Sequence, residues 1–448
     1  MGLVLLLVYF VTLSFVLKKW KWIRHSGIKS QTLIGLFGLK TLVGFGLVFL
    51  YSHYYDSETA DIFIYYHDAI YLKQLILSNR IGVFFDILFN HNISSPSVYN
   101  AYIHLRYWDS STVDFLVYEK RLVILLNLFF SFFSVSHIYI HSMFMAFIGF
   151  LGQIGIYRFV KRQSNLSPLI ILFFTFLLPT FTLWSASILK EPLIIFSVGL
   201  FLFFIGKWVK RWNRKYLFGA ILFYALGLVV KPYVMLSLSL PIFIFILFKI
   251  RKQWPLSKQS LIVAGSLLGL LLLFWGLSFI NINIFEKLAG KQGDFYKTIE
   301  LAEQDRTVGS FIDVGVLDGS MWSVIYHTPK AFLNVLLRPN VLDYKTLLYL
   351  PDIFQNLLFL MLIMGLFLKF RKPKPEEYPF LWLSVLFVIV LFTLIGLVTP
   401  VLGAIVRYKI PALIFLFFFI LSFLKMDFIS KKYSSLFLWE KKKNKILR

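Results

Sequence analysis

Acidic side chains gather in the segment YSHYYDSETADIFIYYHDAIYL, which follows directly on an apolar run. If residues 58–78 form a helix lying on a membrane surface, Asp61 and Asp68 project from one face of it, with Tyr65 one turn before Asp68. Two such carboxylates can divide general acid and base chemistry between them, one ionised and one protonated, or can hold a divalent cation. The same spacing suits the water-facing side of an ordinary amphipathic helix, so the sequence leaves both interpretations open.

Asp56 and His67 stand in the same segment and can support such a site. A histidine that serves as a metal ligand is usually accompanied by a second ligand at a fixed spacing. His67 has no such histidine partner, so we interpret it as a hydrogen-bonding residue at the membrane surface. The sequence therefore assigns no metal ligands and no certain cofactor, and it leaves a divalent cation at the two carboxylates open.

Basic residues recur where apolar runs meet short turns on the same predicted side as Asp61. They are Lys190 beside Glu191 in WSASILKEPL, Lys231 in VVKPYV, Arg338 in LLRPN, and Arg407 and Lys409 in GAIVRYKIP. Cations near lipid headgroups are well placed to bind the phosphate or diphosphate of a lipid-linked donor, Arg through its planar fork and Lys as a point charge. Snorkelling of long side chains is the alternative, and Glu191 also suits the N-terminus of a helix.

The elements that position these residues are long apolar runs. Of the 448 residues, 58% are hydrophobic and 15% charged, and the mean hydropathy is +0.76. Soluble domains carry about 25% charged residues, which excludes a soluble enzyme. Runs of roughly 17 to 25 apolar residues fit a hydrocarbon layer about 30 Å thick. We therefore predict an all-α polytopic membrane protein, with residues 1–448 forming a single integral membrane domain.

Eleven spans are expected, together with interfacial helices. The spans are 2–17, 36–52, 137–158, 168–184, 191–206, 216–230, 233–250, 260–280, 353–369, 380–398 and 408–424. The apolar segment 121–134 is too short for a span and is predicted to be interfacial or re-entrant. Two large loops, 53–120 and 281–352, lie between the spans, and the first is expected to contain interfacial helices.

The charge pattern orients these spans. The chain holds 46 Lys and Arg against 22 Asp and Glu, a formal charge of +24. Basic residues follow the run 2–17 and none precedes it, so we expect an uncleaved span with its N-terminus outside. The predicted cytoplasmic stretches then hold 29 Lys and Arg with four acids, and the external stretches hold 16 with 18. This segregation predicts that both large loops are external and that the basic tail 425–448 is cytoplasmic, and it removes the need for a nucleic-acid partner.

Function classes can be narrowed further. The chain has no cysteine, no GxxxxGK[ST] phosphate loop and no dinucleotide fingerprint, so chemistry is expected outside and without direct use of ATP. Charged residues inside the predicted spans are nearly absent, with Lys40 the clear case. That scarcity argues against a transporter.

The whole pattern resembles the GT-C superfamily of polytopic glycosyltransferases. The segments PTFTLWSASILKEPLIIF, LLRPN and GAIVRYKIPAL are similar to those of bacterial envelope proteins of the exopolysaccharide type. The resemblance implies a bacterial cytoplasmic (inner) membrane location and a polyprenyl-(di)phosphate-linked sugar or oligosaccharide as donor. It also implies a catalytic carboxylate in the first external loop, for which Asp61 and Asp68 are the matching residues, with Asp56 behind them. That loop contains no DxD or ExD pair, so the resemblance does not extend to the metal-dependent variant.

The expected function is a membrane glycosyltransferase of cell-envelope or exopolysaccharide synthesis. Lys190, Lys231, Arg338 and Arg407 would neutralise the leaving phosphate, and Asp61 or Asp68 would activate the acceptor hydroxyl. A Wzy-type polysaccharide polymerase or ligase is the closest alternative. A transporter or a non-catalytic assembly scaffold is the alternative from another class. Membrane lipid is an expected partner, and no protein partner is indicated.

Overall fold

The computed structural model describes residues 1–54, 60–108, 118–251, 253–305 and 310–425. Within these ranges every regular element is a helix, and β-structure is limited to two isolated bridges. Asp56 lies outside the described residues. Short 3-10 turns occur at Val341–Asp343, Leu347–Tyr349 and Pro375–Glu377.

Eight helices are long and apolar enough to cross a membrane. They are α1 (Gly2–Lys19), α3 (Ser30–Tyr54), α8 (Ile138–Gln163), α11 (Glu191–Arg211), α13 (Pro232–Ile250), α14 (Leu256–Ser278), α17 (Leu350–Leu368) and α18 (Tyr378–Val398). A ninth candidate is the pair α19 (Leu402–Tyr408) and α20 (Ile410–Leu421), which meet at a bend of 64°. The prediction of an all-helical membrane protein is thereby confirmed.

The two other predicted spans also fall on helices, but one of them is divided and the other stands at the lower length limit for a membrane-spanning helix. Residues 168–184 are divided between α9 (Pro168–Phe176) and α10 (Pro179–Trp184), since Pro179 has no backbone N–H to continue α9. Residues 216–230 lie in α12 (Arg214–Val230), which has 17 residues. The described residues therefore show eight or nine candidate spans and do not confirm eleven.

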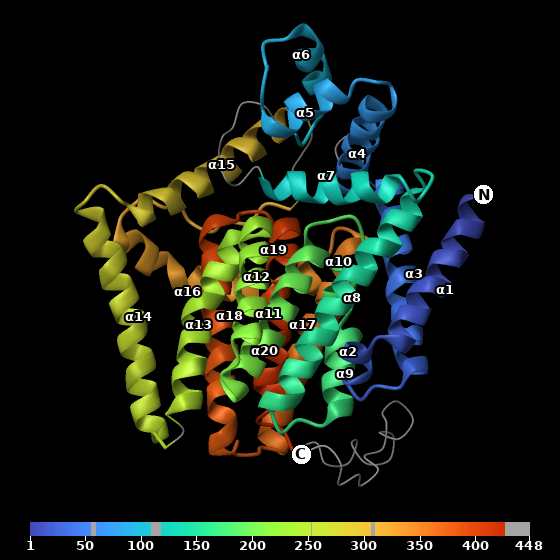
Figure 1. Cartoon of the computed structure of the whole chain (residues 1–448). Helices are drawn as coiled ribbons and strands as arrows, with labels where there is room; N and C mark the ends of the chain where they lie inside the picture. The colour runs from blue at the N-terminus through green and yellow to red at the C-terminus, as the bar shows by residue number, and fades with distance from the viewer. Residues whose placement is uncertain (55–59, 109–117, 252, 306–309, 426–448) are drawn as a thin grey trace.

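The two large loops gather at one end of the bundle, which we call the loop end (Figure 1). Their helices are α4 (Asp61–Leu77), α5 (Ile81–Phe89), α6 (Pro96–Ile103), α7 (Tyr118–Ser131), α15 (Ile284–Asp305) and α16 (Met321–Leu337). In Figure 1, α7 lies across the bundle, and it packs against α4 and α12. This placement suits the interfacial helix predicted over 121–134. The short α2 (Lys21–Arg24) lies at the opposite end, as does the end of the described chain.

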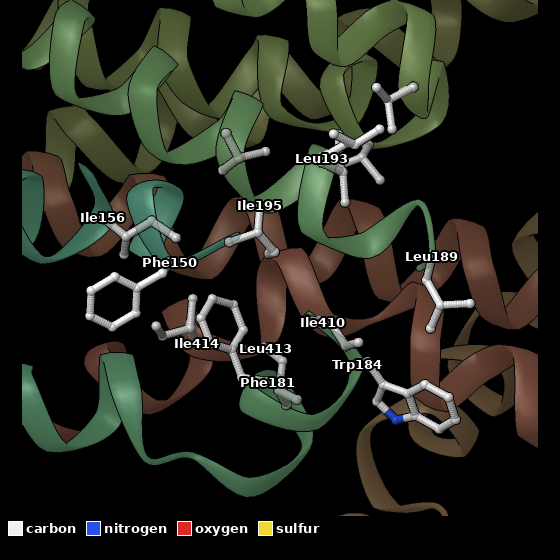
Figure 2. Close-up of a cluster of buried hydrophobic side chains, with 14 of the residues drawn as sticks. Phe150, Ile156, Phe181, Trp184, Leu189, Leu193, Ile195, Ile410, Leu413 and Ile414 are labelled. Atoms are coloured by element: carbon white, nitrogen blue, oxygen red, sulfur yellow. The ribbon is translucent and has the colours of Figure 1, made fainter. Parts of the chain in front are cut away.

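Close packing of α8 on α11 forms the centre of the bundle. A Cβ added at Gly199 would lie 2.1 Å from the carbonyl oxygen of Gly152, so only glycine allows this approach of the two backbones. Figure 2 shows the adjoining core, in which Ile410, Leu413 and Ile414 of α20 meet side chains of α8, α10 and α11. This core brings the end of the chain against its middle, and so places Arg407 near Glu191.

Candidate functional site

Four segments far apart in the sequence converge at the loop end. Arg407 of α19 donates from Nη1 to Asp61 Oδ2 (2.7 Å) and from Nε to Glu191 Oε1 (3.4 Å). Lys231, between α12 and α13, donates from Nζ to the same Glu191 oxygen at 2.9 Å. Asp61 is the first residue of α4 and Glu191 the first of α11. The structure thus joins four of the predicted site residues in one ionic cluster, which we call the Arg407 cluster.

Glu191 is the buried centre of this cluster. Its side chain is 1% exposed and that of Lys231 4%, whereas Asp61 retains 27% exposure. A buried carboxylate is stable only when charges or hydrogen bonds compensate it, and here two cations do so. The N-terminus of α11 adds a favourable dipole to Glu191. Glu191 therefore binds the two cations and not a phosphate. Among the residues predicted to bind phosphate, it serves as the counter-charge of Arg407 and Lys231.

Tyr107 connects the two predicted catalytic carboxylates. Its hydroxyl donates to Asp61, and its backbone N–H donates to Asp68 Oδ2 at 2.9 Å. Asp68 Oδ1 accepts a second backbone hydrogen bond, from Arg106, at 3.1 Å. The ring of Tyr65 packs edge-on against that of Tyr107, with 5.1 Å between the centroids.

Asp68 is buried within the loop helices. The interpretation of Asp61 and Asp68 as a simple water-facing edge is therefore wrong for Asp68, because α4 turns this side of the helix toward Arg106 and Tyr107. Asp68 positions the backbone that carries Tyr107, and Tyr107 in turn binds Asp61.

The two carboxylates differ in their protonation behaviour. Burial acts to raise the pKa of Asp61, but the charge of Arg407 and the hydrogen bonds from Tyr107 and Arg407 outweigh it, so this pKa lies below its usual value. For Asp68, burial outweighs the two backbone hydrogen bonds and raises the pKa. Asp61 is therefore ionised at neutral pH. This is the kind of division between carboxylates that the sequence suggested, although only Asp61 is partly open to solvent.

A cavity of about 430 Å³ opens beside Asp61 and Arg407. Its wall combines α19 with residues of both large loops, and it is lined by Tyr51, Ala60, Asp61, Trp184, Ser310, Lys345, Thr346, Leu348, Tyr349, Val401, Gly403, Ala404, Val406, Arg407 and Tyr408. The Trp184 ring lies under the Arg407 guanidinium, 5.6 Å from its carbon to the ring centroid. Figure 2 shows Trp184 at the edge of the hydrophobic core, and the same residue lines the cavity. A carboxylate, a guanidinium and aromatic rings thus meet in one space.

Lys190 lies beside the Arg407 cluster without lining the cavity. Its Nζ donates to Glu119 of α7, which ties α7 to the start of α11. Burial lowers the pKa of Lys190, and the Glu119 carboxylate offsets part of that effect. Lys190 therefore contributes positive potential near Asp61 from a paired, mostly buried position.

Arg338 and Lys409 do not join the Arg407 cluster. Lys409 is buried, with Nζ 4.0 Å from Asp352 Oδ1 and 2.8 Å from the carbonyl oxygen of Arg338. The Arg338 guanidinium faces Asp343, with 3.8 Å between the charged atoms. Neither side chain lines the cavity, so these two predicted phosphate ligands anchor the chain around α16 and α17.

His67 is exposed and belongs to no group that could hold a metal ion. Across the part of the chain that the structure describes, no cluster of three or more His, Asp or Glu side chains has metal-binding geometry. Lys40 lies inside α3 and donates to Ser185 Oγ at 2.5 Å. Glu191 and Asp352 are also buried, but each stands in the first turn of its membrane-length helix.

Sequence reasoning missed several residues of this region: Tyr107, Glu119, Lys345, Asp352 and Tyr408. Glu119 precedes the predicted interfacial segment, and its acidic charge at the start of an apolar run is a usable signal. Tyr107 and Lys345 stand in loop sequence without any periodic pattern. Their roles depend on which part of each loop folds back over Asp61.

Comparison with family models, with curated proteins and with solved structures finds no match to this chain. The geometry of the Arg407 cluster and its cavity is therefore the basis for the assignment of function.

Proposed function

We propose that the protein is a membrane glycosyltransferase that uses a polyprenyl-phosphate-linked sugar at its loop end. The observation that carries this proposal is that Asp61 and Arg407 line one cavity at the end of an apolar helix bundle. A guanidinium is the preferred ligand of a phosphate group, and a carboxylate can accept the proton of a sugar hydroxyl. An apolar bundle beside the cavity suits a polyprenyl chain.

The proposed reaction is a displacement at the anomeric carbon. The acceptor hydroxyl oxygen forms the new bond to that carbon, and the bond from carbon to the phosphate oxygen breaks. The phosphate leaves with the electron pair and is stabilised by Arg407, with Lys345 at the cavity wall as a second cation. Asp61 accepts the proton of the acceptor hydroxyl. Lys231 and Lys190 act through Glu191 and Glu119, and do not touch the phosphate directly.

The Asp61–Arg407 ion pair gives this mechanism a trigger. A carboxylate with a lowered pKa is a weak base, so the pair at rest is poorly suited to proton transfer. A donor phosphate that binds Arg407 takes over its hydrogen bonds and neutralises its charge. The pKa of Asp61 then rises toward its usual value, which makes Asp61 a better base only when the donor is present.

We also propose the membrane arrangement that the charge pattern predicts. The loop end faces outward across a bacterial cytoplasmic membrane, with the N-terminus outside and the C-terminus in the cytoplasm. In this arrangement α9 with α10, and α12, complete eleven crossings around a GT-C-like core. The Lys-rich opposite end supports that orientation.

The test compares Asp61→Asn with Asp86→Asn, a carboxylate of α5 whose side chain is also 27% exposed and which pairs with His91. Membranes containing each variant are incubated with synthetic polyprenyl-phosphate sugars, and release of polyprenyl phosphate and the sugar product are measured. We expect loss of release in Asp61→Asn and wild-type release in Asp86→Asn. Full activity in Asp61→Asn would overturn the assignment. A product ladder in place of a single addition would favour the polymerase alternative.

A further inference from the structure

A second cavity, of about 750 Å³, lies at the end of the bundle opposite the loop end. It is formed where α8, α11 and α13 end, and we call it the basic pocket. Its lining residues are Arg162, Gln163, Gly206, Lys207, Val209, Lys210, Arg211, Trp212, Lys249 and Ile250. Five of them are cations, and among these described lining residues none is Asp or Glu.

Aromatic rings, and not carboxylates, are the contacts that hold several of these cations. Lys207 Nζ lies 4.8 Å from the centroids of Phe203 and of Tyr216, and the Arg162 guanidinium lies 5.5 Å from that of Phe203. Arg211 donates to the Tyr216 hydroxyl at 3.5 Å. A ring face orients a cation but leaves its N–H groups available for an anion.

The ends of the helices compensate only part of this charge. Each helix C-terminus carries roughly −0.5 charge, so three of them supply about −1.5 against five cations. Interaction of the basic side chains with the helix C-termini therefore leaves a large excess of positive charge around the pocket. That excess is the potential which attracts a multiply charged anion.

Apolar groups stand beside the cations in the same pocket. Trp212 caps α11 with a left-handed backbone (φ 49°). Trp212 is 58% exposed and Ile250 is 50% exposed. Trp at a membrane boundary places its ring among lipid headgroups. A ligand of this pocket thus meets cations at one side and apolar surface at the other.

We propose that the basic pocket binds the phosphate headgroup of an anionic lipid whose acyl chains extend along the bundle. Basic pockets between membrane helices recognise lipid phosphates by the same chemistry. Lys207 and Lys210 of α11, with Arg162 of α8, supply the charge, and Trp212 with Ile250 supplies the apolar contact. This inference does not depend on the proposed glycosyltransferase activity, because the basic pocket lies at the other end of the molecule.

The experiment measures lipid retained by the full-length protein in detergent, by native mass spectrometry after reconstitution in phosphatidylglycerol or in phosphatidylcholine vesicles. The pocket variant is Lys207→Gln with Lys210→Gln. The matched control is Lys369→Gln with Lys372→Gln, which removes two exposed cations that lie after α17 at the same end. We expect retention of phosphatidylglycerol by wild type and control, with affinity on the order of twentyfold lower in the pocket variant, since each cation near the surface contributes about fivefold.

A charge-preserving variant, Lys207→Arg with Lys210→Arg, keeps the experiment decisive if the Gln variant folds poorly, and it should retain phosphatidylglycerol. Equal retention of phosphatidylcholine, or an equal loss in the control, would overturn the proposal. Titration with inorganic pyrophosphate separates the two sources of phosphate. Binding of pyrophosphate as tightly as the lipid would assign the basic pocket to a free phosphate compound and overturn a lipid ligand.

Discussion

The two ends of the helix bundle use the same cationic residue types in opposite ways. At the loop end, Arg407, Lys231 and Lys190 each contact a carboxylate, so their charges are compensated before any ligand arrives. In the basic pocket, Lys207, Lys210 and their neighbours surround a hollow whose described lining contains no carboxylate. The first arrangement can hold a reactive carboxylate in place and release it. The second can attract an anion but offers no carboxylate among its described lining residues to accept a proton.

Removal of Glu191 tests the paired end most severely. Glu191→Gln leaves Lys231 and Arg407 buried without their shared counter-charge, which should lower the free energy of unfolding by about 3–5 kcal/mol. Thermal or denaturant unfolding in detergent measures this, with the exposed Glu286→Gln as control. A change no larger than that of the control would show that the pairing at the loop end is not structural.

Arg407→Lys asks whether geometry or charge matters in the Arg407 cluster. Lysine keeps the charge but cannot bind Asp61 and Glu191 through separate nitrogens of one planar fork. The free energy of unfolding should therefore fall by about 1.5–3 kcal/mol. Both the free energy of unfolding and the rate of polyprenyl phosphate release should fall. If the Lys variant matches wild type in both measurements, a point charge suffices at this position.

The pH dependence of stability separates Asp61 from Asp68. Because the folded pKa of Asp61 is lowered, its contribution is present above its unfolded pKa of about 3.9 and is lost as pH falls through the folded value. Asp68 has a raised folded pKa, so its contribution is present below the unfolded value and is lost as pH rises through the folded one.

The free energy of unfolding, measured between pH 3 and pH 7, should therefore be plotted against pH for each variant. Relative to wild type, the slope of this plot should change in opposite directions in Asp61→Asn and Asp68→Asn. Parallel changes would mean that the two carboxylates share one environment.

The smallest effect is expected at the basic pocket. Lys210 is exposed, so Lys210→Gln should change the free energy of unfolding by less than about 0.5 kcal/mol. Lys231→Gln, which leaves Glu191 with one cation fewer, serves as the contrast and should cost several times more. Equal costs for the two lysines, in the same detergent unfolding measurement, would erase the difference between the ends.

Hydropathy predicted most of the fold because a membrane helix needs only length and apolar character, properties that each segment carries by itself. The breaks were harder to predict. The run 168–184 reads as continuous, yet Pro179 divides it, and the run 408–424 begins with the bend between α19 and α20. A proline interrupts the backbone hydrogen bonding of a helix, however long the apolar stretch around it.

The amino-acid sequence by itself determined that the chain is a helical membrane protein with basic residues concentrated between certain runs, since composition and local periodicity do not depend on distant contacts. It also singled out Asp61, Glu191, Lys231 and Arg407. Only the tertiary structure decided that these four meet, that Asp68 supports Tyr107, and that Arg338 and Lys409 lie apart from them. Pairing of charges hundreds of residues apart depends on how α8, α11 and α20 pack, and no local pattern encodes that.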